Sequence, residues 1–139
     1  MIRNLDHESL FIIACANVKA ARNNLYEDDV VLMNFALFNI SEAIVKLLRF
    51  LCLCYSIDFS DSVSSFHLAD KLMKKDIQIP QLIMDSLSEY VSWNTKGICE
   101  VNQIVDKGYA EKHILCVESW IASLEKQMLL KNPYSKKKS

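Results

Sequence analysis

Glycine and proline are scarce in this sequence, with two of each among 139 residues. All-β and α/β folds depend on these residues at their turns, so the scarcity argues against both classes. Hydrophobic residues make up 51% of the chain, which is ample for a core. A chain of this length usually forms one domain, which buries roughly two thirds of its unfolded surface. The composition therefore predicts an all-α protein with a single core.

A large net charge of either sign is also missing. Sixteen lysines and arginines stand against 17 aspartates and glutamates, a formal charge of -1. Without a strong overall field, any binding to nucleic acid or to an anionic membrane must be local. The longest apolar segment, Val30 to Tyr55, is interrupted by Glu42, Lys46 and Arg49. It lacks the run of about 18 uncharged residues that is typical of a membrane helix, and we expect no membrane contact.

The five cysteines are an odd number, and the sequence shows no secretory signal pattern. Four of them stand among apolar residues of predicted helices, which favours reduced, buried thiols in a cytoplasmic protein. Cys52 and Cys54 resemble a pair of metal ligands. Two residues apart on a helix, however, they point about 200° apart and cannot share a metal ion. The cysteines are residues 15, 52, 54, 99 and 116.

The segment Val30 to Tyr55 predicts one long central helix, because it contains neither glycine nor proline. Its apolar residues point in several directions, so the helix should be surrounded by others. Both Phe38 and Leu48 are then expected in the core. A preceding helix is predicted from Asn4 to about Leu25, with Asn4 or Asp6 as its N-cap. The short bend that follows predicts an antiparallel helical hairpin.

Three more helices are predicted after a polar loop from Ser56 to Ser65. A short helix begins at Phe66, with Lys71, Lys74 and Lys75 on its solvated side. Another begins at Ile79-Pro80, since proline is tolerated in a first turn. The last follows Gly108 and ends near Leu130, with Asn132-Pro133 as its stop. We therefore predict an up-and-down bundle of about five helices, with the first two long and antiparallel, as one domain over residues 1–131. Residues 132–139 form a frayed basic tail.

Catalytic and metal-binding signatures are missing. The three histidines have no partner at the spacing of metal ligands, and no phosphate-binding glycine loop, nucleophile elbow or Glu-x-x-His pair occurs. We expect no metal, no cofactor and no catalytic residue. Glu111, Glu118 and Glu125 recur every seven residues, which favours a charged outer helix face over an acid/base pair.

Three stretches, taken in order, resemble the HEPN family of small helical-bundle domains from bacteria and archaea. Residues 34–49, NFALFNISEAIVKLLR, resemble the family's A-x-F-H-x-x-Q-A-x-E-K-x-L-K stretch, with Ala36, Phe38, Ala43, Lys46, Leu48 and Arg49 in register. Residues 66–72, FHLADKL, are similar to its T-H-D-L-x-x-L motif. Residues 90–97, YVSWNTKG, are similar to Y-I-x-x-R-Y-P-G. The similarity runs from the first predicted helix to about Leu130.

The departures from the family concern its chemistry. Members that act as metal-independent ribonucleases carry an Arg followed, after four to six residues, by a His. Here Asn94 stands in the Arg position, and neither Arg3, Arg22 nor Arg49 is followed by a His at that distance. Asn39 and Val45 also replace the family's His and Glu. Without a fixed cation and a general acid/base, ribonuclease chemistry loses its main contributions, so we do not expect an enzyme.

The resemblance therefore implies a non-catalytic HEPN-like binding module. It is expected to act as a homodimer, because the long helices carry more apolar surface than a monomer covers. The family suggests a nucleotidyltransferase-like protein or a nucleotide as its partner. Two alternatives are a ribonuclease toxin of a toxin–antitoxin pair with a degenerate active site, and a structural adaptor unrelated to nucleotides.

A ligand- or partner-binding site is predicted where residues 93–96 face the central helix. Trp93 offers a stacking surface, and Asn94 and Thr95 offer hydrogen bonds. Lys96 adds positive charge. From the central helix, the site would include Asn39, Lys46 and Arg49. The alternative is that Trp93 is a core residue, that Lys46 and Arg49 extend to solvent, and that Asn94 accommodates an irregularity near Gly97.

Overall fold

The computed structural model describes residues 7–25, 30–96 and 107–134, without the side chains of residues 30–31 and 93–96. Every regular element in these ranges is a helix, which agrees with the all-α prediction. None of the described helices is long and apolar enough to cross a membrane. The helices are α1 (His7–Asn24), α2 (Val30–Cys54), α3 (Ser65–Lys74), α4 (Gln81–Asp85), α5 (Leu87–Lys96) and α6 (Lys107–Met128).

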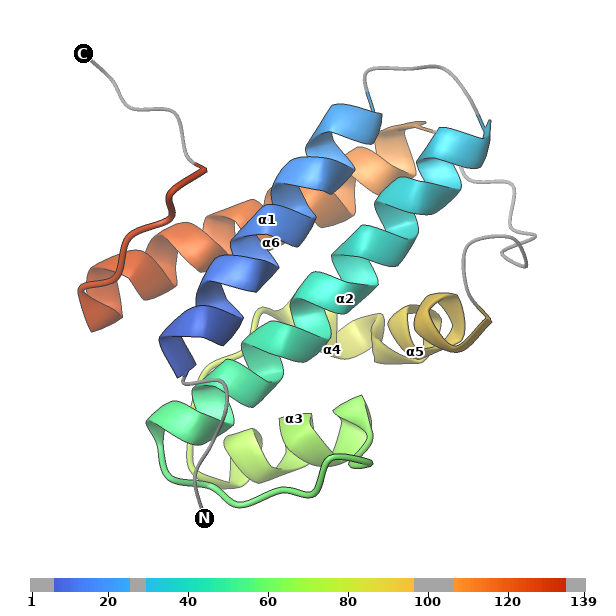
Figure 1. Cartoon of the computed structure of the whole chain (residues 1–139). Coiled ribbons are helices and arrows are strands. Elements are labelled where there is room, and N and C mark those ends of the chain that lie inside the picture. The colour runs from blue at the N-terminus through green and yellow to red at the C-terminus, as the bar shows by residue number, and fades with distance from the viewer. Residues whose placement is uncertain (1–6, 26–29, 97–106, 135–139) are drawn as a thin grey trace.

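Helix α2 is the centre of the fold. It contacts α1, α3, α5 and α6. Figure 1 shows α1 and α2 side by side, with α6 behind α1 and α3 at the C-terminal end of α2. One side of α2 is fully buried, including Leu37, Ile44 and Leu48. Its Phe50 ring packs against Phe11 of α1, with ring centroids 5.2 Å apart.

The opposite side of α2 remains partly exposed, at positions that the sequence did not identify. Residues on this side recur every three and four positions, and each is half-buried or exposed: Phe35, Phe38, Glu42, Val45, Lys46, Arg49 and Leu53. We call this row the outer stripe of α2. The expectation that α2 is surrounded on all sides is therefore wrong, because its apolar residues extend beyond the surface that the other described helices cover.

The predicted fourth helix is broken into two. Helix α4 ends at Asp85, and Ser86 has φ -108 and ψ 11, outside the helical region. The backbone N–H of Ser86 donates to the carbonyl oxygens of Leu82 and Ile83, and its own carbonyl accepts the first bonds of α5. Serine tolerates this geometry because it favours helix ends over helix interiors. Gly97 lies directly after α5, in the part of the chain outside the described residues.

The scarcity of glycine affects how three helices end. Glycine is the residue that most readily takes the left-handed conformation after a helix. Here Ser56 (φ 56), Asp76 (φ 61) and Leu129 (φ 55) take it after α2, α3 and α6. The following residue then bonds back to the helix, as in the Schellman motif: Ile57 N to Cys52 O (2.8 Å), Ile77 N to Leu72 O (3.1 Å) and Leu130 N to Glu125 O (3.1 Å).

The loop between α2 and α3 is held by side chains from both helices. Ser64 caps α3 by accepting a hydrogen bond from the His67 backbone N–H at 3.2 Å. Lys71 Nζ donates to the Asp58 carbonyl oxygen at 2.8 Å, and Arg49 donates to that of Asp61 at 2.9 Å. Lys71 is therefore half-buried, whereas Lys74 and Lys75, on the same side of α3, are exposed as predicted.

Candidate functional site

The predicted site includes the last turn of α5. Residues 93–96 belong to this helix, and α5 packs against α2. The side chains of Trp93, Asn94, Thr95 and Lys96 lie outside the described residues, so their part in the site stays a prediction.

The three predicted site residues on α2 have partners within the chain. Asn39 Oδ1 accepts a hydrogen bond from Asn17 Nδ2 of α1 at 3.2 Å, and its own Nδ2 donates to the Phe35 carbonyl oxygen. Lys46 pairs with Glu42 of the same helix at 2.7 Å. Arg49 bonds to the loop after α2 and lies 5.7 Å from the centre of the Phe59 ring.

A second polar cluster, which the sequence did not predict as a site, joins α1 to α6. The guanidinium of Arg22 contacts both Glu111 and Glu118 at 2.7 Å, with bonds to both oxygens of each carboxylate. These bonds, those to Glu118 above all, raise the pKa of Arg22. Glu111 and Glu118 keep 37% and 36% of their side-chain surfaces exposed, so they lie at the edge of the contact between α1 and α6. The sequence places them on one side of a helix but cannot say that this side faces α1.

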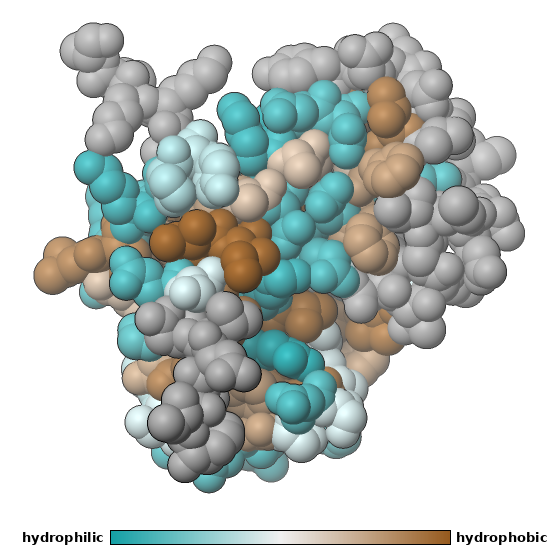
Figure 2. Space-filling view, in the orientation of Figure 1, coloured by the Kyte–Doolittle hydropathy of each residue, from teal (hydrophilic) through white to brown (hydrophobic). Residues whose placement is uncertain are grey.

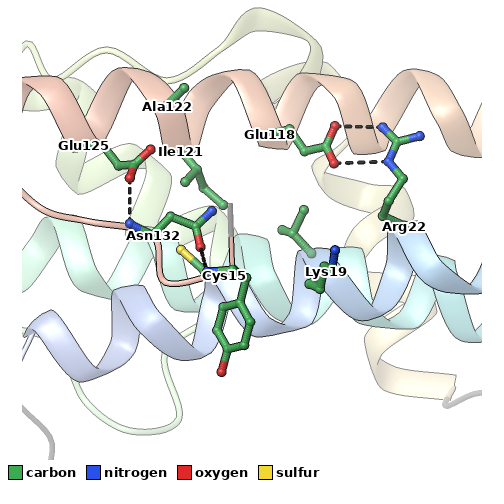
Figure 3. Close-up of a pocket in the computed structure, with 10 residues that line it drawn as sticks. Cys15, Lys19, Arg22, Glu118, Ile121, Ala122, Glu125 and Asn132 are labelled. Carbon is green, nitrogen blue, oxygen red and sulfur yellow. Dashed lines mark hydrogen bonds and ion pairs between the residues drawn. The ribbon is translucent and has the colours of Figure 1, made fainter. Parts of the chain in front are cut away.

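A pocket of about 360 Å³ lies next to the Arg22–Glu118 pair. We call it the α1–α6 pocket. Its apolar wall includes Val18 of α1 and Ile121 and Ala122 of α6. Figure 3 shows Arg22 and Glu118 at one end and Glu125 with Asn132 at the other.

The segment after α6 closes one side of this pocket. The Asn132 backbone N–H donates to Glu125 Oε2 at 2.6 Å, and Asn132 Oδ1 accepts from the Tyr134 backbone N–H at 2.8 Å. Both residues line the pocket. The first residues of the predicted frayed tail are thus bonded to α6, and residues 135–139 lie outside the described part of the chain. Helix α6 ends at Met128, before the predicted stop at Asn132-Pro133.

Cys15 lines the same pocket and is almost fully buried. Burial and the nearby Glu125 carboxylate raise the pKa of its thiol to about 12. The thiol is therefore protonated at neutral pH and is a poor nucleophile. Cys15, Cys52, Cys54 and Cys116 all lack a disulfide partner, and Cys99 lies outside the described residues.

A buried aromatic cluster joins α5 to α6. The Tyr90 hydroxyl lies 2.6 Å from His113 Nδ1, and the Tyr109 ring packs on the same imidazole at 4.6 Å between ring centroids. The Tyr109 hydroxyl donates to Glu89 at 2.7 Å. Burial lowers the pKa of His113, so the imidazole is neutral at pH 7. The cluster fastens α5 to α6.

A wider groove of about 760 Å³ lies on another side of α6. The segment 75–80 between α3 and α4 forms one wall together with Gln81 of α4, and Tyr55 just after α2 contributes to another. Side chains of Ser119, Ser123 and Gln127 give the α6 wall a neutral polar character.

The described residues form an all-α protein with one central helix, and the α1–α6 pocket and the wider groove both lie along α6. Within the described ranges, no group of three His, Cys, Asp or Glu side chains is placed to hold a metal ion. Comparisons with protein-family models, with curated proteins and with solved structures found no match to this chain.

Proposed function

We propose that this protein is a non-catalytic HEPN-like binding module that acts as a homodimer in the cytoplasm. Its proposed partner is a nucleotide or a nucleotidyltransferase-like protein. The observation that carries the proposal concerns the arginines. Arg22 is bound by two carboxylates and is therefore not available as a cation beside a scissile phosphate, and Arg49, which donates to the loop after α2, has no His at the family's spacing after it. Arg3 lies outside the described residues.

The proposed architecture is that of the family, an up-and-down bundle in which α1 and α2 form an antiparallel hairpin. The extensive contact between α1 and α2 supports it. The interhelical hydrogen bond between Asn17 and Asn39 is consistent with a fixed register of this pair.

The proposed nucleotide or partner site is the end of α5 together with Asn39, Lys46 and Arg49. Two observations support it. Helix α5 packs against α2, and the Lys46–Glu42 pair is partly exposed, with 22% and 30% of the side-chain surfaces accessible. Such pairs within one helix contribute only about 0.3–0.5 kcal/mol, so a phosphate or a partner carboxylate can compete for Lys46.

The outer stripe of α2 supports the proposed dimer. Phe35 is 36% exposed, and Phe38 and Val45 are half-buried. Figure 2 shows hydrophobic and hydrophilic residues intermixed over the face on which α1 and α2 lie in Figure 1. The apolar residues of the stripe, which are spaced by three, seven and eight positions and so lie on one side of the helix, suit packing against a second helix: Phe35, Phe38, Val45 and Leu53.

Calorimetry with ATP and with a purified nucleotidyltransferase-like protein tests the site. We expect binding to the wild type, and at least about tenfold weaker binding for Lys46→Glu and Lys96→Glu. Lys126→Glu reverses an exposed charge on α6 and serves as the control, with unchanged affinity. Absence of binding by the wild type, or equal loss in the control, contradicts the proposed site.

An RNA cleavage assay tests the proposed lack of catalysis. We expect the purified protein to leave single-stranded and transfer RNA intact. Cleavage that is abolished by Asn94→Ala would show that the module is a nuclease.

A further inference from the structure

The α1–α6 pocket has the dimensions of a site for a small molecule. Its volume of about 360 Å³ is near the lower end of ligand pockets, which span about 300–1,000 Å³. Val18 and Ile121 are almost fully buried and form an apolar floor, and polar groups stand around it. The combination suits a ligand with an apolar body and few charged groups.

The charged groups of the pocket are not all neutralised within the chain. Arg22 and Glu118 neutralise each other. Among the described residues, Lys19 forms no ion pair or hydrogen bond, although it lines the pocket. Glu125 uses Oε2 to hold Asn132, while Oε1 accepts no hydrogen bond from the described residues. The pocket therefore offers one ammonium and one carboxylate oxygen to a ligand.

These two groups lie at different levels along the paired helices. Glu125 and Cys15 line the same pocket, and Figure 3 shows both at its Asn132 end. Lys19 is one turn further along α1, about 6 Å at 1.5 Å per residue. In Figure 3, Lys19 lies toward the Arg22 end of the pocket, away from Glu125. A separation of one turn, spanned in part by the flexible Lys19 side chain, matches a molecule whose ammonium and carboxylate groups are a few ångströms apart.

We propose that the α1–α6 pocket binds a small zwitterion with an apolar body, of the size of a single apolar α-amino acid. The ligand ammonium binds Glu125 Oε1, its carboxylate binds Lys19 Nζ, and its side chain packs on Val18 and Ile121. Asn132 and Tyr134 cover one side of the ligand. The site is separate from the nucleotide or partner site proposed on α2 and α5.

Calorimetry and thermal unfolding with L-leucine, L-methionine and L-phenylalanine test this site. We expect at least one of them to bind and to raise the melting temperature at about 10 mM. For L-leucine, two analogues keep the apolar body and remove one charge each. Isoamylamine lacks the carboxylate and 4-methylpentanoate lacks the ammonium, so each should bind at least about tenfold more weakly than the zwitterion.

Two variants assign the charges to residues. Lys19→Met should lower the affinity for L-leucine to that for isoamylamine. Glu125→Gln should lower it to that for 4-methylpentanoate, and the glutamine oxygen still accepts the Asn132 N–H, so the cover of the pocket is preserved. Lys126→Met, on the exposed side of α6, is the matched control and should bind as the wild type does.

Three results would overturn the proposal: no binding of any of the three amino acids at about 10 mM, analogues that bind as tightly as L-leucine, or binding unaltered in both pocket variants. The charge reversals on Lys46 and Lys96 should leave amino-acid binding unchanged. Failure of one site is thus distinguishable from failure of the other.

Discussion

At the scale of a single residue, Leu129 shows the conformational strain that arises where a helix ends without a glycine. Its φ of 55 belongs to the left-handed region, and its side chain is 91% exposed, so no packing compensates for the strain. A non-glycine residue in this conformation costs roughly 1 kcal/mol. We therefore expect Leu129→Gly to stabilise the fold by about 1 kcal/mol in urea unfolding. Leu129→Ala keeps a Cβ atom and should give little gain; equal gains in both variants would contradict the explanation.

His113 makes the stability dependent on pH. Burial lowers its pKa below the ordinary 6.5, the nearby Lys112 acts in the same direction, and Glu89 opposes them. The unfolded chain therefore binds a proton more readily than the folded one. The stability from this group is complete above pH 6.5 and is lost as the pH falls toward the folded pKa, by at most about 1.4 kcal/mol per pH unit.

Urea unfolding at about pH 7.5 and about pH 5.5 measures this loss. The double variant Tyr90→Phe/His113→Leu removes the hydroxyl and the imidazole together, so that neither of these two groups is left without the other. We expect it to show a smaller difference between the two pH values than the wild type does. The same difference in both proteins would mean that other groups cause the pH dependence.

The residue scale is where the sequence predicted the candidate sites least well. The spacing of Glu111, Glu118 and Glu125 correctly places them on one side of α6. Periodicity carries no information about which neighbour that side meets, and Arg22, the partner of Glu111 and Glu118, is 89 and 96 residues away in sequence. The sequence also did not indicate that Asn132 lines the α1–α6 pocket. An Asn-Pro pair after a helix predicts only that the helix ends there, and not that the chain then runs back along α6.

At the scale of helices, α2 was predicted well in extent and less well in surroundings. Its predicted range, Val30 to Tyr55, differs from the observed one by a single residue. Leu48 is fully buried, but Phe38 lies on the outer stripe and is only half-buried. The sequence predicted both residues in the core. Apolar residues lie on nearly all sides of this helix, so their pattern does not show which side lacks a neighbour.

A pair of substitutions in α2 tests this difference. Leu48→Asp should unfold the protein, because an unpaired buried carboxylate costs several kcal/mol out of a total stability of about 5–15 kcal/mol. Phe38→Asp should leave a folded, helical protein, since the carboxylate can reach solvent. Circular dichroism during thermal unfolding distinguishes the outcomes, and a folded Leu48→Asp protein would contradict the central position of α2.

The Arg22 cluster tests how α1 and α6 are held together. Its side chains are partly exposed, 21% for Arg22, 37% for Glu111 and 36% for Glu118, so solvent and salt weaken the pairs. Two bidentate contacts on one guanidinium still exceed an ordinary surface pair. We expect Arg22→Met to cost about 1–2 kcal/mol, and less at high salt.

Lys74→Met is the matched control for this cluster. The Lys74–Asp70 pair is 3.1 Å long and much more exposed, at 75% and 58%, so its loss should cost less than about 0.5 kcal/mol. Arg22→Lys should behave more like the methionine variant than like the wild type, because one ammonium cannot form two bidentate contacts. Equal costs for Arg22→Met and Lys74→Met would show that the cluster is an ordinary surface network.

At the scale of the whole molecule, composition predicted the all-α class because it depends on many residues at once. The number of helices was harder, since one serine divides the predicted fourth helix. A binding surface for a partner is still harder to predict from the sequence. A surface for a second copy differs from a buried face only in what covers it, and the outer stripe of α2 became visible only after the other helices were placed.

That stripe leads to a prediction about the mass of the protein in solution. If the stripe of one chain packs on that of a second, light scattering at micromolar concentration should report about 32 kDa, twice the 16.0 kDa of the chain. Phe38→Asp places a charge in the proposed interface and should give a folded monomer. Leu115→Asp changes an apolar residue of α6 that is 52% exposed and should leave the dimer intact. A monomeric wild type would mean that the stripe is not a dimer interface, and dissociation by Leu115→Asp alone would place the interface on α6.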